Sequence, residues 1–226
     1  MRFYYFLLAI LFVNFSNCCA QDIEQSTKGN FISTDYPQGL YLTFEDFTDK
    51  NAINIGEFLT RKPVVGFKQI DKNQVVDQVF FFNAKNNSKI TNAFAISYNG
   101  SIYFQQRYIQ KMSSKEDRNQ EGDNPNSYHR VTKDGKFFYL EGAFANGWSK
   151  AFAYGSGGAV GGTLGSSLNR LKGVVFDMEK KEFNYIRECI DLNALLEKYK
   201  SDKVDCEDKK KIDILFVREV IDRIIK

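Results

Sequence analysis

Alternating apolar and polar positions dominate the middle of the chain and predict an antiparallel β-sheet. Short aromatic-rich segments follow a period of two, and clusters of Asn, Asp, Gly and Lys separate them. The dipeptides Asn99-Gly100 and Asp134-Gly135 each predict a two-residue hairpin turn, because these residues accept the positive φ angles that such turns require. The predicted strands are 64–70, 75–83, 93–98, 101–106, 128–132, 136–140, 173–178 and 182–186.

Helical patterns flank this region on both sides. Near the start, Thr43 followed three residues later by Asp46 is the pattern of a capping box, and Phe44 and Phe47 share one helix face. We expect the neighbouring Glu45 and Asp46 to be solvated residues of the first turn rather than an acid–base pair. A short amphipathic helix is therefore predicted after an extended segment.

Two helices are predicted at the end of the chain. Asp191 is the predicted N-cap of the first, which carries apolar residues at helical spacing. The second has a continuous apolar face opposite a face of mixed charge, a pattern typical of a helix that docks on a sheet. The residues of that apolar face are Phe216, Val217, Val220, Ile221, Ile224 and Ile225.

The predicted fold class is α+β, mainly an antiparallel sheet with hairpins, a short N-terminal helix, a glycine-rich segment and C-terminal helices. The most polar run, 111–127, is predicted to be a long exposed connection, because strand patterns resume directly after it. We expect a single domain over 37–226, which is long enough to bury a core.

The glycine-rich segment, 151–169, carries no charge. Gly157, Gly161 and Gly165 recur every fourth position, a spacing that lets another backbone approach closely. Three alternatives stay open: a loop or irregular strand, a buried helix with a glycine face, and membrane insertion. In a helix, the six glycines would cost roughly 5–6 kcal/mol relative to alanine. We expect another backbone to pack against the three glycines.

Phosphate binding by this segment is not predicted. The spacing of Gly157 and Gly162 matches the outer glycines of a P-loop, but Thr163 stands where that motif requires lysine. We therefore predict no bound cofactor.

The first twenty residues predict a secretory signal peptide. Arg2 precedes an apolar run that is too short to span a membrane, and the small residue Ala20 ends it. We predict cleavage after Ala20, which makes Gln21 the mature N-terminus, followed by a mobile leader over 21–36. Lipidation of Cys18 or Cys19 is the alternative, although the preceding residues depart from the usual lipoprotein pattern.

Charge and cysteine usage restrict the classes of partner. Without Arg2 the basic count is 31 − 1 = 30, against 28 acidic residues, so the net charge is +2. This balance argues against nucleic acid and against an anionic membrane surface as partners. Cys189 and Cys206 remain as an even pair in an exported chain, and they predict a disulfide, with two free thiols as the alternative.

The segment 39–47, Gly-Leu-Tyr-Leu-Thr-Phe-Glu-Asp-Phe, with the later step Lys62-Pro63, resembles a family of small exported Bacteroidota proteins, a domain family of unknown function. An insertion over 51–58 departs from the family pattern. The family is uncharacterised, so the resemblance implies export and supplies no activity.

Few residues offer recognisable chemistry. His129 is the only histidine, which excludes a histidine-based metal cluster within one chain, and we predict it to be a partly exposed sheet residue. The aromatic runs 80–82 and 137–139 and the residue Trp148 could stack on glycans, although such residues more often fill a sheet core. Pairs of carboxylates for sugar hydrolysis stay open, since their spacing is spatial rather than sequential.

Three functional classes follow. The favoured one is an exported protein of the periplasm, the outer-membrane periphery or the medium, with a non-catalytic binding or envelope-structural role and an envelope component or protein as partner. The second is a membrane-associating or self-assembling protein that acts through 151–169. The third is a carboxylate-based hydrolase.

Overall fold

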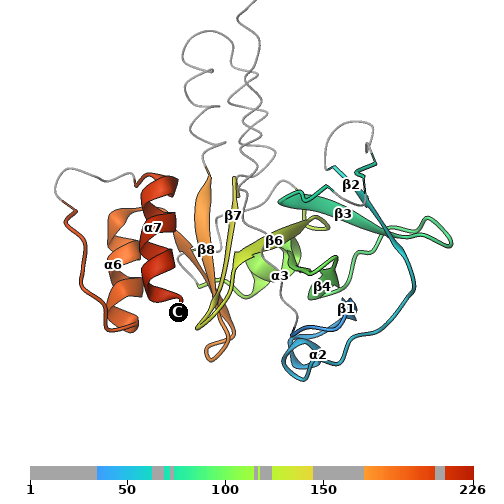
Figure 1. Cartoon of the computed structure of the whole chain (residues 1–226), viewed down its shortest axis with the longest axis horizontal. Coiled ribbons are helices and arrows are strands. Elements are labelled where there is room, and N and C mark those ends of the chain that lie inside the picture. The colour runs from blue at the N-terminus through green and yellow to red at the C-terminus, as the bar shows by residue number, and fades with distance from the viewer. Residues whose placement is uncertain are drawn as a thin grey trace, which may run out of the picture.

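The computed structural model describes residues 35–62, 69–71, 74–114, 117, 124–144, 171–206 and 212–226 (Figure 1). The strands are β1 (Gly39–Tyr41), β2 (Phe58–Arg61), β3 (Gln78–Asn83), β4 (Ala95–Tyr98), β5 (Ser101–Gln105), β6 (Tyr128–Lys133), β7 (Phe138–Gly142), β8 (Lys172–Asp177) and β9 (Glu182–Ile186). The helices are α2 (Phe44–Thr48), α3 (Gln106–Lys111), α6 (Cys189–Lys198) and α7 (Ile214–Ile224). The predicted α+β class, with a mainly antiparallel sheet and helices near each end, is confirmed.

Strand β6 is where the sheet divides. The main path runs β1-β4-β5-β6-β7-β8-β9, and every pairing along it is antiparallel. On the edge of β6 away from β5, the start of the strand pairs with β3, where Gln78 lies opposite His129, and the later part pairs with β7, where Val131 lies opposite Leu140. Strands β2 and β3 therefore form one arm of the sheet, and β7 to β9 form the other.

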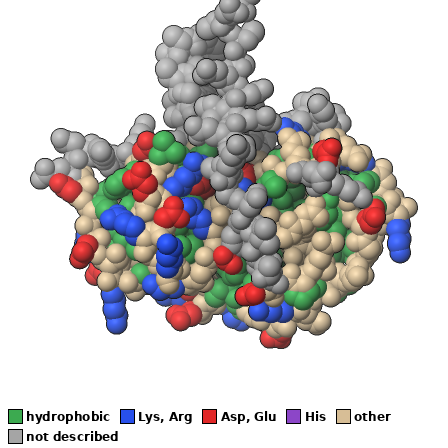
Figure 2. All heavy atoms as spheres, viewed as in Figure 1, with side chains coloured by type: hydrophobic (Ala, Val, Ile, Leu, Met, Phe, Trp, Pro, Cys, Tyr) green, Lys and Arg blue, Asp and Glu red, His purple; other side chains and the backbone are tan. Residues whose placement is uncertain are grey.

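The two arms lie on opposite sides of β6, and helices α6 and α7 form the end of the molecule opposite β2 and β3 (Figure 1). Helices α6 and α7 cover the β7–β9 arm and share a buried apolar cluster with it. Acidic and basic side chains are interspersed over this helical end on the face drawn in Figure 2. Within the part of the chain that the structure describes, no helix combines the length and the apolar character needed to cross a membrane.

Helix α2 anchors an aromatic core. Its capping box forms as predicted, with the backbone N–H of Asp46 3.0 Å from the hydroxyl of Thr43 and the backbone N–H of Thr43 3.0 Å from the carboxylate of Asp46. Phe47 is fully buried and makes edge-to-face contacts with Phe94 and Phe138, among other rings. Such contacts add to the burial of large apolar rings, so the short helix is held by its packing.

The two dipeptide turns have different outcomes. Asn99-Gly100 forms a two-residue turn between β4 and β5, with φ angles of 49° and 72°, as predicted. The prediction for Asp134-Gly135 is wrong in length, because four residues connect β6 to β7. The reason lies at the end of the chain, where the carbonyl oxygen of Ile225 accepts a hydrogen bond of 3.0 Å from the N–H of Lys136. The connection is shaped by this contact rather than by its own sequence.

The last helices need two corrections. Asp191 is not the N-cap of α6: Glu188 occupies that position, and the Asp191 carboxylate accepts a 3.0 Å hydrogen bond from the Glu188 backbone N–H. Helix α6 therefore begins three residues earlier than its apolar spacing suggested. On α7 most of the predicted apolar face is buried, but Phe216 is 38% exposed.

Several sequence predictions lie outside the described residues. They are the signal peptide 1–20 with its cleavage site between Ala20 and Gln21, nearly all of the leader 21–36, most of the predicted strand 64–70, Trp148, and the glycine-rich segment 151–169 with Gly157, Gly161 and Gly165. The hairpin after this segment is confirmed as β8 and β9. The strand β2 and the helix α3 were not predicted.

Candidate functional site

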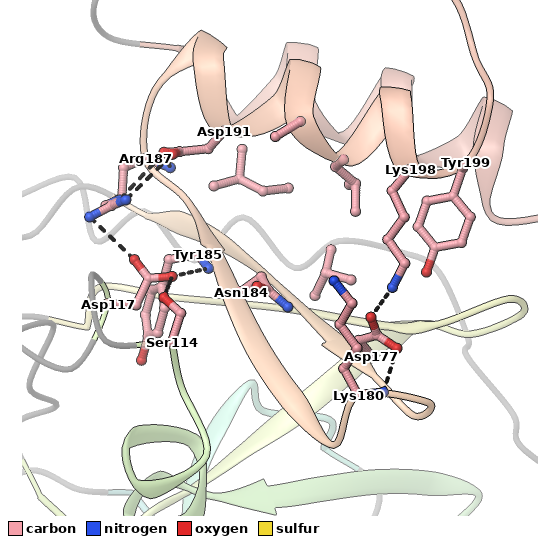
Figure 3. A pocket seen from close by; sticks show the side chains of 14 residues that line it. Ser114, Asp117, Asp177, Lys180, Asn184, Tyr185, Arg187, Asp191, Lys198 and Tyr199 are labelled. Carbon is pink, nitrogen blue, oxygen red and sulfur yellow. Dashed lines mark hydrogen bonds and ion pairs between the residues drawn. The ribbon is translucent and has the colours of Figure 1, made fainter.

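A pocket of about 370 Å³ lies between helix α6 and the β8–β9 hairpin (Figure 3). Pockets of this size hold small molecules in other proteins. Apolar side chains line its middle, including Val175 of β8, Ile186 of β9 and Leu195 of α6. Charged side chains gather at its two ends, so the site has an apolar middle between polar ends.

At one end, Arg187 lies between two carboxylates (Figure 3). Its guanidinium group is 3.2 Å from the carboxylate of Asp117 and 3.4 Å from that of Asp191. Arg187 directly follows β9, and Asp191 belongs to the first turn of α6. The turn from strand to helix therefore places the arginine and its helical partner at the mouth of the pocket.

Asp117 reaches the same end from the connection between α3 and β6. One oxygen, Oδ2, accepts hydrogen bonds of 3.1 Å from the backbone N–H of Tyr185 and from the Ser114 hydroxyl. Burial raises the pKa of the Asp117 carboxyl above its ordinary value. The prediction that 111–127 is an exposed connection is wrong here, because Ser113 and Asp117 are both buried.

That connection is held in place by β9. The backbone N–H of Phe183 donates a 2.9 Å hydrogen bond to the carbonyl of Met112, and Ser113 forms a parallel bridge with Phe183. The polar residues of 111–127 are thus tied to the sheet at this point. A polar composition alone does not reveal such a tie, since backbone groups make it.

At the other end, the β8–β9 turn and the last turn of α6 bring two lysines together (Figure 3). Lys198 pairs with the Asp177 carboxylate, which also accepts hydrogen bonds of 3.0 and 3.1 Å from the backbone N–H groups of Glu179 and Lys180. Burial lowers the pKa of the Lys198 ammonium. Among the described residues, the Lys180 ammonium has no ion-pair partner, and in Figure 3 it lies on the pocket side of the turn.

A disulfide fixes the start of helix α6, which lines one side of the pocket. Cys189, the first residue of α6, is bonded to Cys206, with a Cα–Cα distance of 5.7 Å, so the predicted disulfide is confirmed. Asn193 supports the same connection, since its side-chain amide bonds both the N–H and the C=O of Val204, at 2.8 and 2.9 Å. A disulfide is compatible with an exported protein.

The single histidine lies elsewhere and is buried, which corrects the prediction of partial exposure. The His129 side chain packs 4.7 Å from the ring of Phe144, in the interior of the sheet. Burial lowers its pKa to about 3, so the ring is neutral at physiological pH. Within the described part of the chain, no group of three or more metal-ligating residues comes together.

The aromatic run 80–82 offers no open platform for sugars. Phe80, Phe81 and Phe82 are all buried. The ammonium of Lys89 lies 3.3 Å from the ring centre of Phe80, and the guanidinium of Arg61 lies 4.1 Å from that of Phe82, so cations cover these faces. Residues 137–139 are buried in the same way. Both runs are core, which was the alternative weighed for them.

The sequence pointed to few of the pocket residues. Of its predicted site residues that the structure describes, Cys189 and Cys206 hold the start of helix α6 but do not line the pocket. Arg187 and Asp191 carry a detectable signal, since they are oppositely charged and four positions apart, although Arg187 lies just before the helix rather than on it. Asp177 and Lys198 carry none, because a hairpin and a distant helix turn bring them together.

No protein-family model matches the chain, and neither does any curated protein or solved structure. The resemblance of 39–47 to exported Bacteroidota proteins therefore stays a prediction.

Proposed function

We propose that this chain is an exported, non-catalytic binding protein of the cell envelope, and that the α6 pocket is where it holds a small molecule. Its place would be the periplasm, the outer-membrane periphery or the medium. The observation that carries the proposal is the pocket itself, with an apolar middle, charged ends and a volume of about 370 Å³. The Cys189–Cys206 disulfide supports export, because such bonds persist in oxidising compartments.

The pocket is held in shape before any ligand arrives. The disulfide fixes the start of α6, and ion pairs fix Arg187 and Lys198 at its two ends. A site whose side chains are already ordered loses less conformational entropy on binding, so more of the contact energy contributes to affinity. A rigid pocket of this kind suits recognition of one ligand class.

The test is to block the pocket without touching its charges. Ala194 lines the pocket, so Ala194→Phe should fill it, whereas Ile190→Phe adds the same ring at a position that is 71% exposed. Thermal melts would be recorded with a panel of amino acids, short peptides, dicarboxylates and monosaccharides. We expect at least one compound to raise the melting temperature of the wild type and of Ile190→Phe, but not that of Ala194→Phe.

Two outcomes would refute a binding role for this pocket. In the first, no compound of the panel shifts the melting temperature of the wild type. In the second, Ala194→Phe responds to the ligand as strongly as the wild type does. Export is tested separately, by cell fractionation followed by N-terminal analysis of the mature chain, which we expect to begin at Gln21.

A carboxylate-based hydrolase is the second candidate, and one observation favours it. Asp117 and Asp191 lie on the same side of the pocket, each paired with Arg187, and burial raises the pKa of Asp117. Glycoside hydrolysis uses a pair of carboxyl groups, one of which has a raised pKa. Release of nitrophenol from a set of nitrophenyl glycosides, abolished by Asp117→Asn, would establish this activity in place of simple binding.

A further inference from the structure

The two ends of the pocket carry opposite net charges. Asp117, Asp191 and Arg187 sum to −1 − 1 + 1 = −1 at one end. At the other end, the two lysines that flank one carboxylate sum to +1 + 1 − 1 = +1, from Lys180, Lys198 and Asp177. Since the middle of the pocket is largely apolar, little screening separates the two fields. The pocket is therefore an electric dipole with its charges at the ends.

We infer that the pocket takes a short peptide with free termini, whose ammonium group lies against Asp117 and whose carboxylate lies between Lys180 and Lys198. This inference rests on the proposed function. It goes beyond that proposal by naming the ligand class and its direction in the pocket.

At the acidic end, one carboxylate oxygen lacks a hydrogen-bond donor. Asp117 Oδ1 is buried, and although Arg187 lies 3.2 Å from it as an ion pair, it accepts no aligned hydrogen bond within the described part of the chain. A buried carboxylate oxygen without a donor is costly, and an ammonium group can supply up to three donors. A peptide ammonium that took the place of the Arg187 guanidinium beside this oxygen would donate the hydrogen bond that it lacks.

At the basic end, Lys180 and Tyr199 supply hydrogen-bond donors to the pocket. Lys180 has no ion-pair partner among the described residues, and Tyr199 lines the pocket at the same end. Glu179, on the same turn, is exposed, but it is not one of the residues that line the pocket. A carboxylate at this end of the pocket would therefore contact the two lysines that line it.

The spacing of the ends sets the length of the ligand. Asp191 and Lys198 are seven residues apart on α6, which corresponds to about 10.5 Å at 1.5 Å per residue. The two charges of an amino acid lie too close together to reach both ends. An extended chain covers about 3.3–3.6 Å per residue, so a peptide of two or three residues fits. Asn184 lines the pocket and offers an amide that can bond a peptide group.

The experiment compares trialanine with two blocked forms and with alanine, by titration calorimetry on the full mature chain. N-acetylated trialanine lacks the ammonium group, and trialanine amide lacks the carboxylate. Loss of one charged hydrogen bond should weaken binding about tenfold or more. We expect trialanine to bind more tightly than either blocked form, and alanine to bind more weakly than trialanine.

Two variants assign the ends. Lys180→Gln should weaken binding of trialanine and leave binding of trialanine amide unchanged, because the amide has no carboxylate to lose. Lys200→Gln removes the same charge at an exposed position and should leave all affinities unchanged. Asp117→Asn should weaken trialanine but not its acetylated form. Lys180 is exposed in a turn, so its variant keeps the test meaningful even if Asp117→Asn fails to fold.

The inference is overturned if the blocked forms bind as tightly as trialanine, or if Lys180→Gln and Lys200→Gln behave alike. Its failure can be told apart from failure of the proposed function. If a sugar or a dicarboxylate binds the wild type but not Ala194→Phe, the pocket is a binding site and only the peptide assignment is wrong. If nothing binds, both proposals fall.

Discussion

Glu141 of β7 and Arg218 of α7 form a bidentate ion pair, with N–O distances of 2.7 and 2.6 Å, beneath the helices of the β7–β9 arm. Their side chains are 8% and 17% exposed. The hydroxyl of Tyr139 donates a third hydrogen bond to Glu141 at 3.0 Å. The Glu141 carboxylate therefore links Tyr139 of the same strand, β7, to helix α7, which is far away in the sequence.

Breaking this pair should be costly. Replacing Arg218 with alanine leaves the Glu141 carboxylate buried without its cation, and we expect a loss of about 3–5 kcal/mol in the free energy of unfolding. The measurement is urea unfolding of the wild type and the variant. Lys203→Ala is the control, because it breaks the exposed pair with Glu197 and should cost far less stability than Arg218→Ala. Equal losses in the two variants would contradict this prediction.

Gly135 should tolerate no side chain. Its φ angle is 155°, and a Cβ atom there would overlap the carbonyl oxygen of Ile225. Gly135→Ala combines backbone strain with loss of the contact that holds the end of the chain, so we expect a loss above the usual overpacking range of about 1–3 kcal/mol. Gly56→Ala isolates the strain, since its φ angle is 88° but its Cβ would meet only the Lys85 side chain at 3.6 Å. A thermal melt in which Gly56→Ala proves the more harmful would show that the contact with Ile225 does not matter.

Reduction of the disulfide should destabilise the fold. Cys189 and Cys206 are separated by 17 residues, and a closed loop of this length contributes about 3 kcal/mol in the chain-entropy model. We expect a reducing agent to lower the free energy of unfolding by this amount. The double variant Cys189→Ser and Cys206→Ser should show the lower stability from the outset and no response to the reducing agent. A wild type that unfolds identically with and without reductant would refute the estimate.

Acid should weaken the fold through His129. Its pKa is lowered by burial from 6.5 to about 3, so between these values the unfolded chain binds more protons than the folded one. The contribution of neutral His129 is fully present above pH 6.5 and is lost as the pH falls toward 3. In this window stability should fall by about 1.4 kcal/mol per pH unit from this group.

The matched variant is His129→Gln, which cannot titrate. Its absolute stability should be lower, because a packed ring is lost, but its slope of unfolding free energy against pH should be flatter than that of the wild type. Urea unfolding at pH 7, 6, 5 and 4 measures both slopes, and parallel slopes would show that His129 does not drive the acid response.

Features that depend on neighbouring residues were predictable from the sequence. The capping box of Thr43 and Asp46 needs only its own spacing, and the Asn99-Gly100 turn needs only two residues that accept positive φ angles. The neighbouring dipeptide Asp134-Gly135 carries an equally strong local signal and still forms a longer turn. The competing contact comes from Ile225, ninety positions away from Gly135 in the sequence, and no local pattern encodes it.

The candidate site depends even more on contacts between residues that are distant in the sequence, which local patterns do not encode. Asp117 comes from a polar connection, Lys180 from a turn and Lys198 from the end of a helix, and only the folded chain brings them to one pocket. The disulfide was predictable because the sequence predicts export, and an even pair of cysteines in an exported chain has few alternatives. Charged residues have many alternative partners, so their pairing could not be read from composition.

The division of the sheet at β6 has a consequence for how the chain folds. Tyr128 and His129 bond strands that precede them in the sequence, while Val131 bonds a strand that follows. If β6 detaches, each arm keeps its own internal ladder but loses its hydrogen bonds to the rest of the sheet, so β6 couples the unfolding of one arm to that of the other. The backbone amides of β6 should accordingly exchange their protons with solvent only through complete unfolding.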